Sequence, residues 1–498
     1  MKLNKLFLIG AIALGLVACD SSEIIPEETV GNEGNSYASI TVKFPKGATV
    51  RTLPGDYNPN GSWTGRDAIE TVTVFLVNTA KGVVDYNSFS KSSFAEIDAS
   101  GILKPNLALK ATAGENIKVY TVINGNTDIL ATLKATSAAN FSTVFAGEAA
   151  KMASEVAKYN AGGTETIMMT NDADNYTIAV AAGATEAEAL AGTKNHVQVS
   201  VERVVSRAML TVEPVTGGNW TVKAKIAGVE TDIATVTGVT YAVGQSNKKF
   251  YIMKKADYST PDPAYTYIPT AADWATNTYF DYSGLASSSF TAAQEFTYDA
   301  TKVNEPLATE TTSKFVLPVN HVVTETDLLT ARDAYKKGNT TYFEIRASFL
   351  PLLVDGAAPV FTVPTTVFLG ANDNKFYSTR ARAEAQGQKA TEFKNGVMKY
   401  VLWLNPNSLV ATVAEPNPMV SPTVRNQIYH AHIDAFLRMG VPNNPLDPND
   451  PNDPLNPENP IDPTDPLKTD FTYLSVSVKV LPWTIHSYKL SLTGDSMY

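Results

Sequence analysis

Apolar and polar residues alternate most regularly near the end of the chain, over residues 469–498. In the first part of this tail the apolar residues occupy every second position: Leu474, Val476, Val478 and Val480. After Pro482 the alternation resumes, with apolar positions at Tyr488, Leu490 and Leu492. A period of two is typical of a β-strand with one apolar face. The pattern therefore predicts one or two strong strands in this tail.

A proline at every third residue separates the tail from the rest of the chain. Nine prolines run from Pro442 to Pro466, with mostly Asn, Asp and Glu between them. Polyproline II has three residues per turn, so prolines at this spacing lie along one edge of such a helix. We therefore predict a stiff, acidic spacer over residues 441–468. Its proline segment reaches about 75 Å at ~3.1 Å per residue. Two interpretations of a strand on such a spacer stay open. It pairs far from its own domain, or it folds back onto that domain.

The rest of the chain predicts strands with few helices. In the first part, runs rich in β-branched residues lie at 69–78, 117–124, 166–170, 176–182 and 196–212, the last long enough to serve two sheets in succession. Residues 127–160 are alanine-rich and show helical spacing. Further strands are expected at 220–226, 249–253, 314–319, 341–350, 359–369, 398–404 and 424–436, with a helix at 325–337. This pattern indicates an all-β fold with a few short helices, arranged as β-sandwiches over residues 52–210 and 211–440.

Charge and hydropathy limit the kinds of partner that we expect the protein to bind. The 498 residues carry a net charge of −10, and no segment concentrates basic residues, so we expect no nucleic-acid partner. After the first 20 residues, no apolar run is long enough to span a bilayer.

The first 19 residues are typical of a bacterial lipoprotein signal peptide. Lys2 and Lys5 precede an apolar stretch, and residues 16–19, Leu-Val-Ala-Cys, form a lipobox. A diacylglyceryl thioether on Cys19, the only cysteine, would anchor the protein to a membrane. The alternative is an ordinary signal peptide with a chance cysteine, and the position of that cysteine argues against it. Residues 20–36 are acidic and are predicted to be a disordered tether.

A short strand is predicted directly after this tether. Its apolar residues again occupy alternate positions: Ala38, Ile40, Val42 and Phe44. Arg51 follows as the first arginine of the chain, where an arginine-specific protease would make its first cut. From spacing alone, an ordinary arginine in a loop is the favoured interpretation.

Motifs for catalysis are missing from the sequence. It contains no phosphate-binding loop, no dinucleotide fingerprint, no Gly-x-Ser-x-Gly elbow and no His-Glu-x-x-His. On a strand, His430 and His432 would share a face with Asp434, as metal ligands can, but paired surface or interface histidines are the favoured interpretation. We therefore predict no enzyme, no cofactor and no metal site among these residues, while a structural Ca²⁺ or Na⁺ elsewhere stays open. The remaining classes are a polymerising fibre subunit and a monomeric surface lipoprotein that binds glycan or protein.

Several segments resemble the fimbrillins of Bacteroidales, closest to the shaft subunit of the short (minor) fimbriae. The resemblance covers nearly the whole chain in the same order, and it includes the lipobox. Its clearest motifs are VERVVSRAM at 201–209, ETIMMT at 165–170, KKGNTTYF at 336–343, VRNQIYHAHI at 424–433 and LPWTIHSYKL at 481–490.

This resemblance implies two tandem transthyretin-like β-sandwich domains and no enzymatic activity. It also implies export to the outer membrane as a lipidated precursor, and then cleavage between Arg51 and Thr52 by an arginine-specific protease. The cut would remove residues 20–51 with their strand. A head-to-tail homopolymer, accessory anchor and tip proteins, and host or bacterial surface receptors would follow as partners, with roles in adhesion, coaggregation and biofilm formation.

A physical mechanism connects the two ends of the chain. If residues 38–44 complete the first sandwich, their loss leaves an open edge and an uncovered apolar groove, which the tail of another subunit could refill. A head-to-tail contact of this kind propagates as a fibre. The candidate donor residues are Trp483, Ile485, Tyr488, Leu490 and Leu492, with 474–480 either closing the parent domain or extending the donor. The rival interpretation is a monomeric, outer-membrane-anchored lipoprotein that keeps Cys19.

Overall fold

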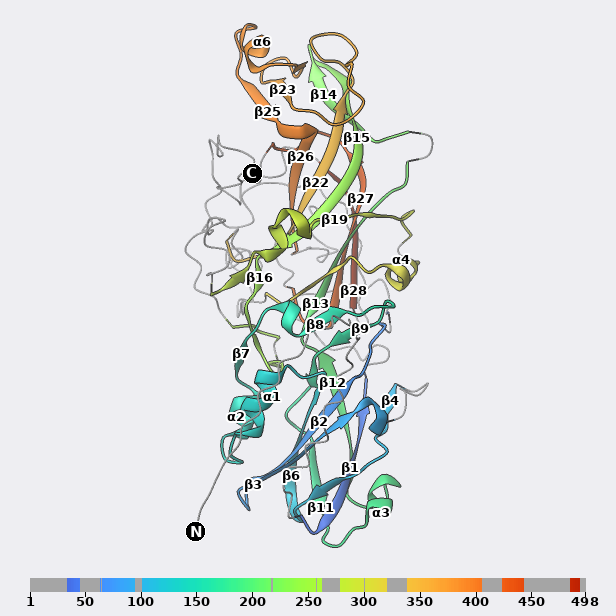
Figure 1. Ribbon diagram of the computed structural model, residues 1–498, viewed down its shortest axis with the longest axis vertical. Helices are drawn as coiled ribbons and strands as arrows, with labels where there is room; N and C mark the ends of the chain where they lie inside the picture. The colour runs from blue at the N-terminus through green and yellow to red at the C-terminus, as the bar shows by residue number, and fades with distance from the viewer. Residues whose placement is uncertain are drawn as a thin grey trace, which may run out of the picture.

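The computed structural model describes residues 34–44, 63, 65–94, 101–215, 218–256, 258–261, 278–299, 301–319, 338–404, 423–442 and 484–492. Strands dominate this part of the chain and the helices are few and short, which confirms the predicted all-β class. The molecule is elongated. Strands up to β12 fill the lower half of Figure 1, and most later strands fill the upper half.

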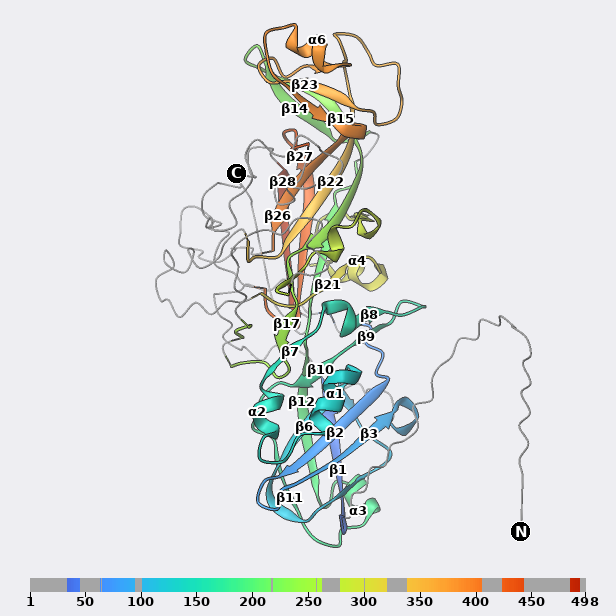
Figure 2. The same cartoon turned by 60° about the vertical axis from the view of Figure 1, so that its left-hand side comes forward.

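The lower half is built on a nine-stranded sheet with the order β3-β2-β6-β10-β12-β1-β4, in which β11 also pairs with β6 and β5 with β1. Its strands are β1 (Ser36–Lys43), β2 (Thr71–Asn78), β3 (Val83–Ser90), β4 (Ile102–Leu103), β5 (Leu109–Ala111), β6 (Gly114–Ile123), β10 (Met169–Asn171), β11 (Thr177–Val180) and β12 (His196–Arg203). Three short helices accompany the sheet: α1 (Thr127–Lys134), α2 (Phe141–Phe145) and α3 (Glu186–Leu190). In both views α3 lies at the free lower end (Figures 1 and 2).

The upper half contains two five-stranded sheets and a small three-stranded one. The first has the order β20-β13-β27-β28 with β21 also on β13, and the second has the order β14-β15-β22-β26 with β19 also on β15. The strands of the first are β13 (Ser206–Val212), β20 (Gln294–Glu295), β21 (Lys314–Val316), β27 (Gln427–Phe436) and β28 (Thr484–Leu492). Those of the second are β14 (Thr221–Ile226), β15 (Val229–Gly244), β19 (Thr291–Ala292), β22 (Tyr342–Pro351) and β26 (Val397–Trp403).

The small sheet lies at the upper tip and pairs β23 (Val367–Gly370) with β24 (Phe376–Tyr377) and β25 (Ala390–Phe393), beside α6 (Arg380–Glu384). The remaining described strands are β7 (Glu148–Ala150), β8 (Ala157–Tyr159), β9 (Glu165–Ile167), β16 (Ser246–Asn247), β17 (Lys249–Tyr251) and β18 (Phe280–Asp281), and the remaining α-helix is α4 (Asn304–Thr309).

The two halves are joined by one run of strand. Residues 196–212 serve both sheets in succession, as their length predicts, with β12 in the lower sheet and β13 in the upper one. The change falls at Val204 and Val205, so the boundary expected at residue 210 lies inside β13. Both valines are fully buried in a core that also holds Phe141 from the lower half and Ile428 from the upper. The halves therefore share apolar packing at their junction.

Several elements differ from the prediction. The 127–160 region forms only α1 and α2 before it turns into short strands, because its apolar spacing is interrupted at Gly147. The strand predicted over 359–369 begins only at Val367, after two prolines that cannot donate to a ladder. The long strand β15 was not predicted, since Thr, Asp and Gly interrupt its alternation. The helix predicted at 325–337 lies outside the described residues.

Candidate assembly site

Strand β1 has a hydrogen-bonded partner on each side. Its residues 39–43 run parallel to residues 196–200 of β12. On the opposite side it is antiparallel to β4, with Val42 opposite Leu103, and to β5, with Ala38 opposite Leu109. The last residues of β12, 201–203, pair with β10. In the sheet, β1 lies between β12 on one side and β4 with β5 on the other, so it connects them. Without β1 there would be a slot with two open edges, a more enclosed site than the single open edge expected.

One face of β1 is part of the core of the lower half. The exposed fractions of Ala38, Ile40, Val42 and Phe44 are 0%, 3%, 1% and 6%. These four side chains pack with apolar residues of β2, β6 and β12. A small cavity remains beneath β1, lined among others by Ala38, Ile40, Val72, Phe89 and Leu109. The side chains of β1 therefore do not fill the space beneath the strand completely.

The polar residues of β1 are held by the walls of the slot. The Ser39 hydroxyl donates to the carbonyl oxygen of Ala189 and lies 2.8 Å from Nδ1 of His196. The Ser36 hydroxyl donates to the carbonyl oxygen of Ala181 at 2.6 Å and accepts from Nδ2 of Asn195 at 3.0 Å. The slot is therefore matched to hydroxyl side chains as well as to apolar ones.

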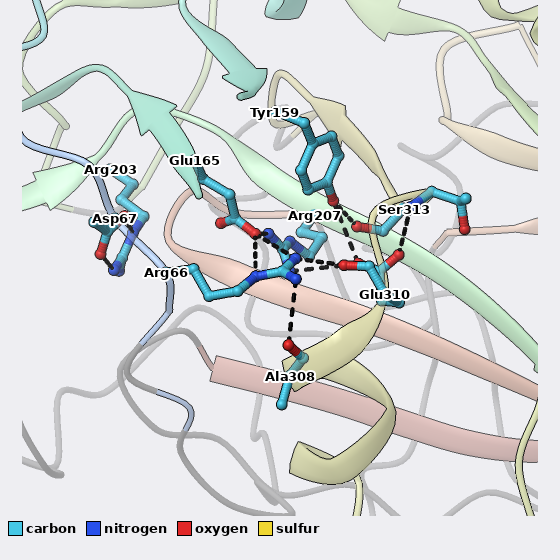
Figure 3. A network of polar contacts seen from close by, with 10 residues as sticks. Arg66, Asp67, Tyr159, Glu165, Arg203, Arg207, Ala308, Glu310 and Ser313 are labelled. Atoms are coloured by element: carbon cyan, nitrogen blue, oxygen red, sulfur yellow. Dashed lines mark hydrogen bonds and ion pairs between the residues drawn. The ribbon is translucent and has the colours of Figure 1, made fainter. Parts of the chain in front are cut away.

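The first described residues after Arg51, which are residue 63 and residues 65–67, make their contacts at the junction of the two halves and not with β1. Trp63, the first of them, is buried, with the Arg207 guanidinium 4.8 Å from the centre of its ring. Asp67 forms a buried ion pair with Arg203, the last residue of β12. Arg66 donates to Glu165 on β9, at 2.9 Å from Nη2, and also to the carbonyl oxygen of Glu310 (Figure 3). This segment therefore spans both halves.

Arg207 is the centre of this network. It is fully buried on β13 and pairs with Glu165 from the lower half and with Glu310, at 3.5 Å, from the upper half (Figure 3). Its guanidinium also lies 5.6 Å from the ring of Tyr159 and 5.3 Å from that of Phe315. Burial lowers the pKa of Arg207, but Tyr159 and the two carboxylates outweigh it, so the net shift is upward and the residue stays charged.

Replacing Arg207 with Ala is expected to lower the free energy of unfolding by about 3–5 kcal/mol, because Glu310 and Glu165, both buried, each lose a charged partner, and Glu165 keeps only Arg66 at 2.9 Å. Chemical denaturation of the uncleaved protein measures this loss. The matched control is Arg438→Ala, which removes a partly exposed pair with Glu230 and should cost below about 1 kcal/mol. Equal losses for the two variants would contradict the role of Arg207.

The tail strand β28 lies at the edge of the upper sheet. It runs parallel to β27, with Thr484 opposite Gln427 and Ile485 opposite Ile428. In the single chain the tail thus folds back onto its own upper half, which is one of the two interpretations its sequence left open. Trp483 and residues 474–480 lie outside the described residues, as do Cys19, Arg51 and Thr52.

The favoured interpretation was a pair of surface or interface histidines, and its surface half is wrong, because His430 and His432 are both fully buried. The strand β27 does direct both rings to one face, where each contacts the Thr211 hydroxyl, His430 Nε2 at 2.7 Å and His432 Nδ1 at 2.9 Å. His432 Nε2 also lies 3.0 Å from a carboxylate oxygen of Glu213. Thr211 and Glu213 come from β13 and the residue just after it, so the pair connects neighbouring strands.

Burial, together with the neighbouring His432, lowers the pKa of His430 to about 3. An unfolded histidine has a pKa of about 6.5, so the unfolded state binds the extra proton first as the pH falls. We expect unfolding free energy to be retained above pH 6.5 and lost below it, by about 2 kcal/mol between pH 6.5 and 5. Denaturation at both pH values measures the loss. His430→Gln should show a clearly smaller one, and an unchanged loss would contradict this assignment.

The junction network is the feature that sequence reasoning missed. Glu165, Arg203 and Arg207 fall inside the motifs ETIMMT and VERVVSRAM, which carry the resemblance, but nothing in their spacing connects them to Trp63 or Glu310. The signal that could have found them is a charged residue inside an otherwise apolar strand, since such a charge is buried only with a partner.

Two further observations concern the described residues. No group of three or more His, Cys, Asp or Glu side chains there is arranged to hold a metal ion. No helix in the same part of the chain is long and apolar enough to cross a membrane.

Comparison with known proteins gives consistent matches. The family model for "Major fimbrial subunit protein type IV, Fimbrillin, C-terminal" matches residues 391–489. Two proteins of Porphyromonas gingivalis, each called "Minor fimbrium subunit Mfa1", are 31% and 30% identical to this chain, and each alignment covers 98% of this chain and 100% of the relative.

Two solved structures show weaker likeness. A putative cell adhesion protein from Bacteroides eggerthii has a TM-score of 0.41 at 13% identity, covering 92% of this chain and 100% of its own. A fimbrilin from Porphyromonas gingivalis has a TM-score of 0.38 at 16% identity, covering 85% and 95%. At these scores the structural likeness carries no argument of its own.

The sequence matches, together with the mainly β architecture, define the class as that of a bacterial fimbrial subunit. The chain belongs to the family of Mfa1-type minor fimbrium subunits. The predicted membership of the fimbrillins is confirmed, and with it a structural role in a cell-surface fimbria.

Proposed function

We propose that the chain is exported as a lipoprotein anchored through Cys19, is cut between Arg51 and Thr52, and then polymerises by exchange of strands between subunits. The mature subunit carries out no reaction, because the one covalent step belongs to an arginine-specific protease. The lipidated precursor resides in the outer membrane, and the product is a surface fimbria.

The observation that supports this proposal most strongly is the contrast between β1 and the segment after Arg51. The covalent connection between β1 and the later part of the chain runs through Arg51, whereas Trp63, Arg66 and Asp67 are held at the junction by buried contacts. A cut at Arg51 would therefore release β1 without disturbing the junction. Until then β1 occupies its own slot and blocks early polymerisation.

The energetics favour refilling the slot. Burying Ile40, Val42 and Phe44 contributes roughly 1.5–3 kcal/mol each, or about 5–9 kcal/mol before backbone hydrogen bonds are counted. An empty slot would expose this apolar surface together with two strand edges, and exposed edges pair readily with other chains. A strand from a second subunit would recover both contributions.

The donor is the C-terminal tail of a neighbouring subunit. Its candidate residues are Trp483, Ile485, Tyr488, Leu490 and Leu492, with 474–480 as an extension. Because donor and slot lie in different halves of the subunit, the contact is head-to-tail and extends into a fibre without closing. Accessory anchor and tip proteins would end the fibre, which would bind host or bacterial receptors in adhesion, coaggregation and biofilm formation.

Amino-terminal sequencing of subunits from purified fibres tests this proposal. A mature chain that begins at Thr52 is the expected result. Fibres whose subunits all retain lipidated Cys19 would overturn it and would favour the alternative of an anchored lipoprotein.

A further inference from the structure

A group of lysines lies at the junction of the two halves, within residues 248–255. We call these four residues the lysine cluster: Lys248, Lys249, Lys254 and Lys255. Lys249 is exposed and the other three are partly exposed, and the stretch contains no acidic residue. The expectation that no segment concentrates basic residues does not hold here. Glu148 of β7 lies 3.7 Å from Lys249, but both side chains are nearly half exposed, so this pair is weak and does not exclude other carboxylates.

Two ammonium groups of the cluster are held in place by tyrosine rings. Nζ of Lys254 lies 4.3 Å from the centre of the Tyr258 ring, and Nζ of Lys255 lies 4.1 Å from that of Tyr251. Lys255 Nζ also donates to the carbonyl oxygen of Ala146 at 2.8 Å. A cation is attracted to the face of an aromatic ring, so both ammonium groups have defined positions.

The lysine cluster lies beside the start of β27. β17, which contains part of the cluster, pairs with β7, and Figure 2 shows the two strands together between the halves. Arg425, two residues before β27, donates to the carbonyl oxygens of Tyr251 and Ile252 at 3.2 and 3.4 Å. The cluster is therefore fixed next to Gln427, the residue opposite Thr484 of the tail strand β28.

The proline spacer carries the opposite charge in a regular arrangement. Residues 442–466 contain six acidic residues and no basic one. Five of the six are aspartates directly before a proline: Asp447, Asp450, Asp453, Asp462 and Asp465. In polyproline II, residues three apart lie along one edge of the helix, about 9 Å from one to the next. The sequence therefore predicts a row of carboxylates along one edge of the spacer and a row of prolines along another.

The fold requires the chain to return from the upper half to the junction between β27 and β28. Before the spacer, Val441 pairs with Lys399 of β26, and after it, Thr484 lies opposite Gln427. Because β27 and β28 are parallel, the connection must run back along the ten residues of β27, about 30 Å at ~3.3 Å per residue. The proline segment alone reaches about 75 Å, so it is long enough to pass over the lysine cluster.

We propose that the lysine cluster is the docking surface for the acidic proline spacer of the same chain. The ammonium groups pair with the row of aspartates, and the partly buried ring of Tyr251 supplies the aromatic surface that proline-rich segments bind. The spacer of the same chain is tethered beside the cluster, so it binds at a far higher effective concentration than a separate molecule. Docking holds the spacer against its own subunit. The inference concerns the uncleaved chain and does not depend on cleavage or strand exchange.

Zero-length cross-linking with a carbodiimide tests this assignment, because the reagent joins a carboxylate directly to an amine in contact with it. The full-length chain, produced without the arginine-specific protease, is cross-linked, recovered as the monomer from a denaturing gel, digested and analysed by mass spectrometry. We expect the spacer to be joined mainly to the lysine cluster. In 1 M salt, where the Debye length is about 3 Å, the yield should fall by about tenfold.

Two variants and a matched control sharpen the test. Lys248→Glu with Lys254→Glu should cause a similar loss of the cross-links to Lys249 and Lys255. The spacer variant Asp447→Asn, Asp450→Asn and Asp453→Asn leaves the described strands unchanged and should also lower the cross-links of Asp462 and Asp465. The control is Lys225→Glu with Lys375→Glu, which makes the same charge change at two exposed positions of the upper tip and should leave the spacer cross-links unchanged.

Cross-links from the spacer to Lys225 and Lys375 at the same yield as to the lysine cluster would overturn the proposal, as would a yield that salt does not change. A monomer without spacer cross-links would overturn it too. Cross-links to the cluster that appear only between two chains would assign the spacer to a neighbouring molecule and exclude docking on its own. None of these results bears on cleavage at Arg51, which amino-terminal sequencing tests.

Discussion

Arg51→Ala is expected to abolish fibre assembly and to leave a longer, membrane-bound monomer. The substitution removes the cleavage site, so β1 stays covalently connected and keeps its place between β12 and the β4–β5 side of the slot. An intramolecular strand competes at a far higher effective concentration than the tail of another subunit. The slot therefore remains closed to the donor.

Electron microscopy of cells and immunoblotting of membrane fractions measure this outcome. Lys46→Ala is the matched control, because it changes another basic residue of the same segment without removing the arginine, and it should assemble normally. Normal fibres from Arg51→Ala would exclude cleavage at this bond as the switch.

Deleting residues 469–498 is expected to give a subunit that is cleaved and released but does not polymerise. The deletion leaves the slot and its anchored surroundings intact, since no described residue of the lower half pairs with β28. The subunit would keep an acceptor and lose its donor. Its open slot also predicts lower stability than that of the uncleaved precursor, by up to the contribution of β1.

Unboiled denaturing gels of the secreted material measure polymerisation directly. A shorter deletion of residues 493–498, beyond the end of β28, is the control and should leave the ladder of multimers unchanged. Polymer from the longer deletion would show that the donor lies elsewhere in the chain.

The strands that could be predicted are those whose sequence pattern lies in consecutive residues. Alternation located β1 and β28 within a few residues, and a run of β-branched residues located β2. The long run over 196–212 likewise predicted a strand shared by two sheets. β15 was missed because Gly238 and its polar neighbours break the alternation at a bulge between Val236 and Gly238.

The junction was not predictable, because its members are far apart in sequence. Arg207 meets Glu310 and Trp63 only after both halves have formed, and no periodicity records such a contact. The histidine pair shows the same limit. Strand geometry correctly placed both rings on one face, but their burial depends on Phe296 and Tyr298, which contribute neighbouring rings from another part of the chain.

The continuous run of β12 and β13 has a mechanical consequence for a fibre that is pulled along its length. Tension would travel along the strands, and the hydrogen bonds between β1 or its replacement and β12 lie across that direction. Such bonds are loaded in shear, so they must break together instead of opening one after another like a zipper. A filament joined in this way resists flowing liquid by geometry as well as by the number of its contacts.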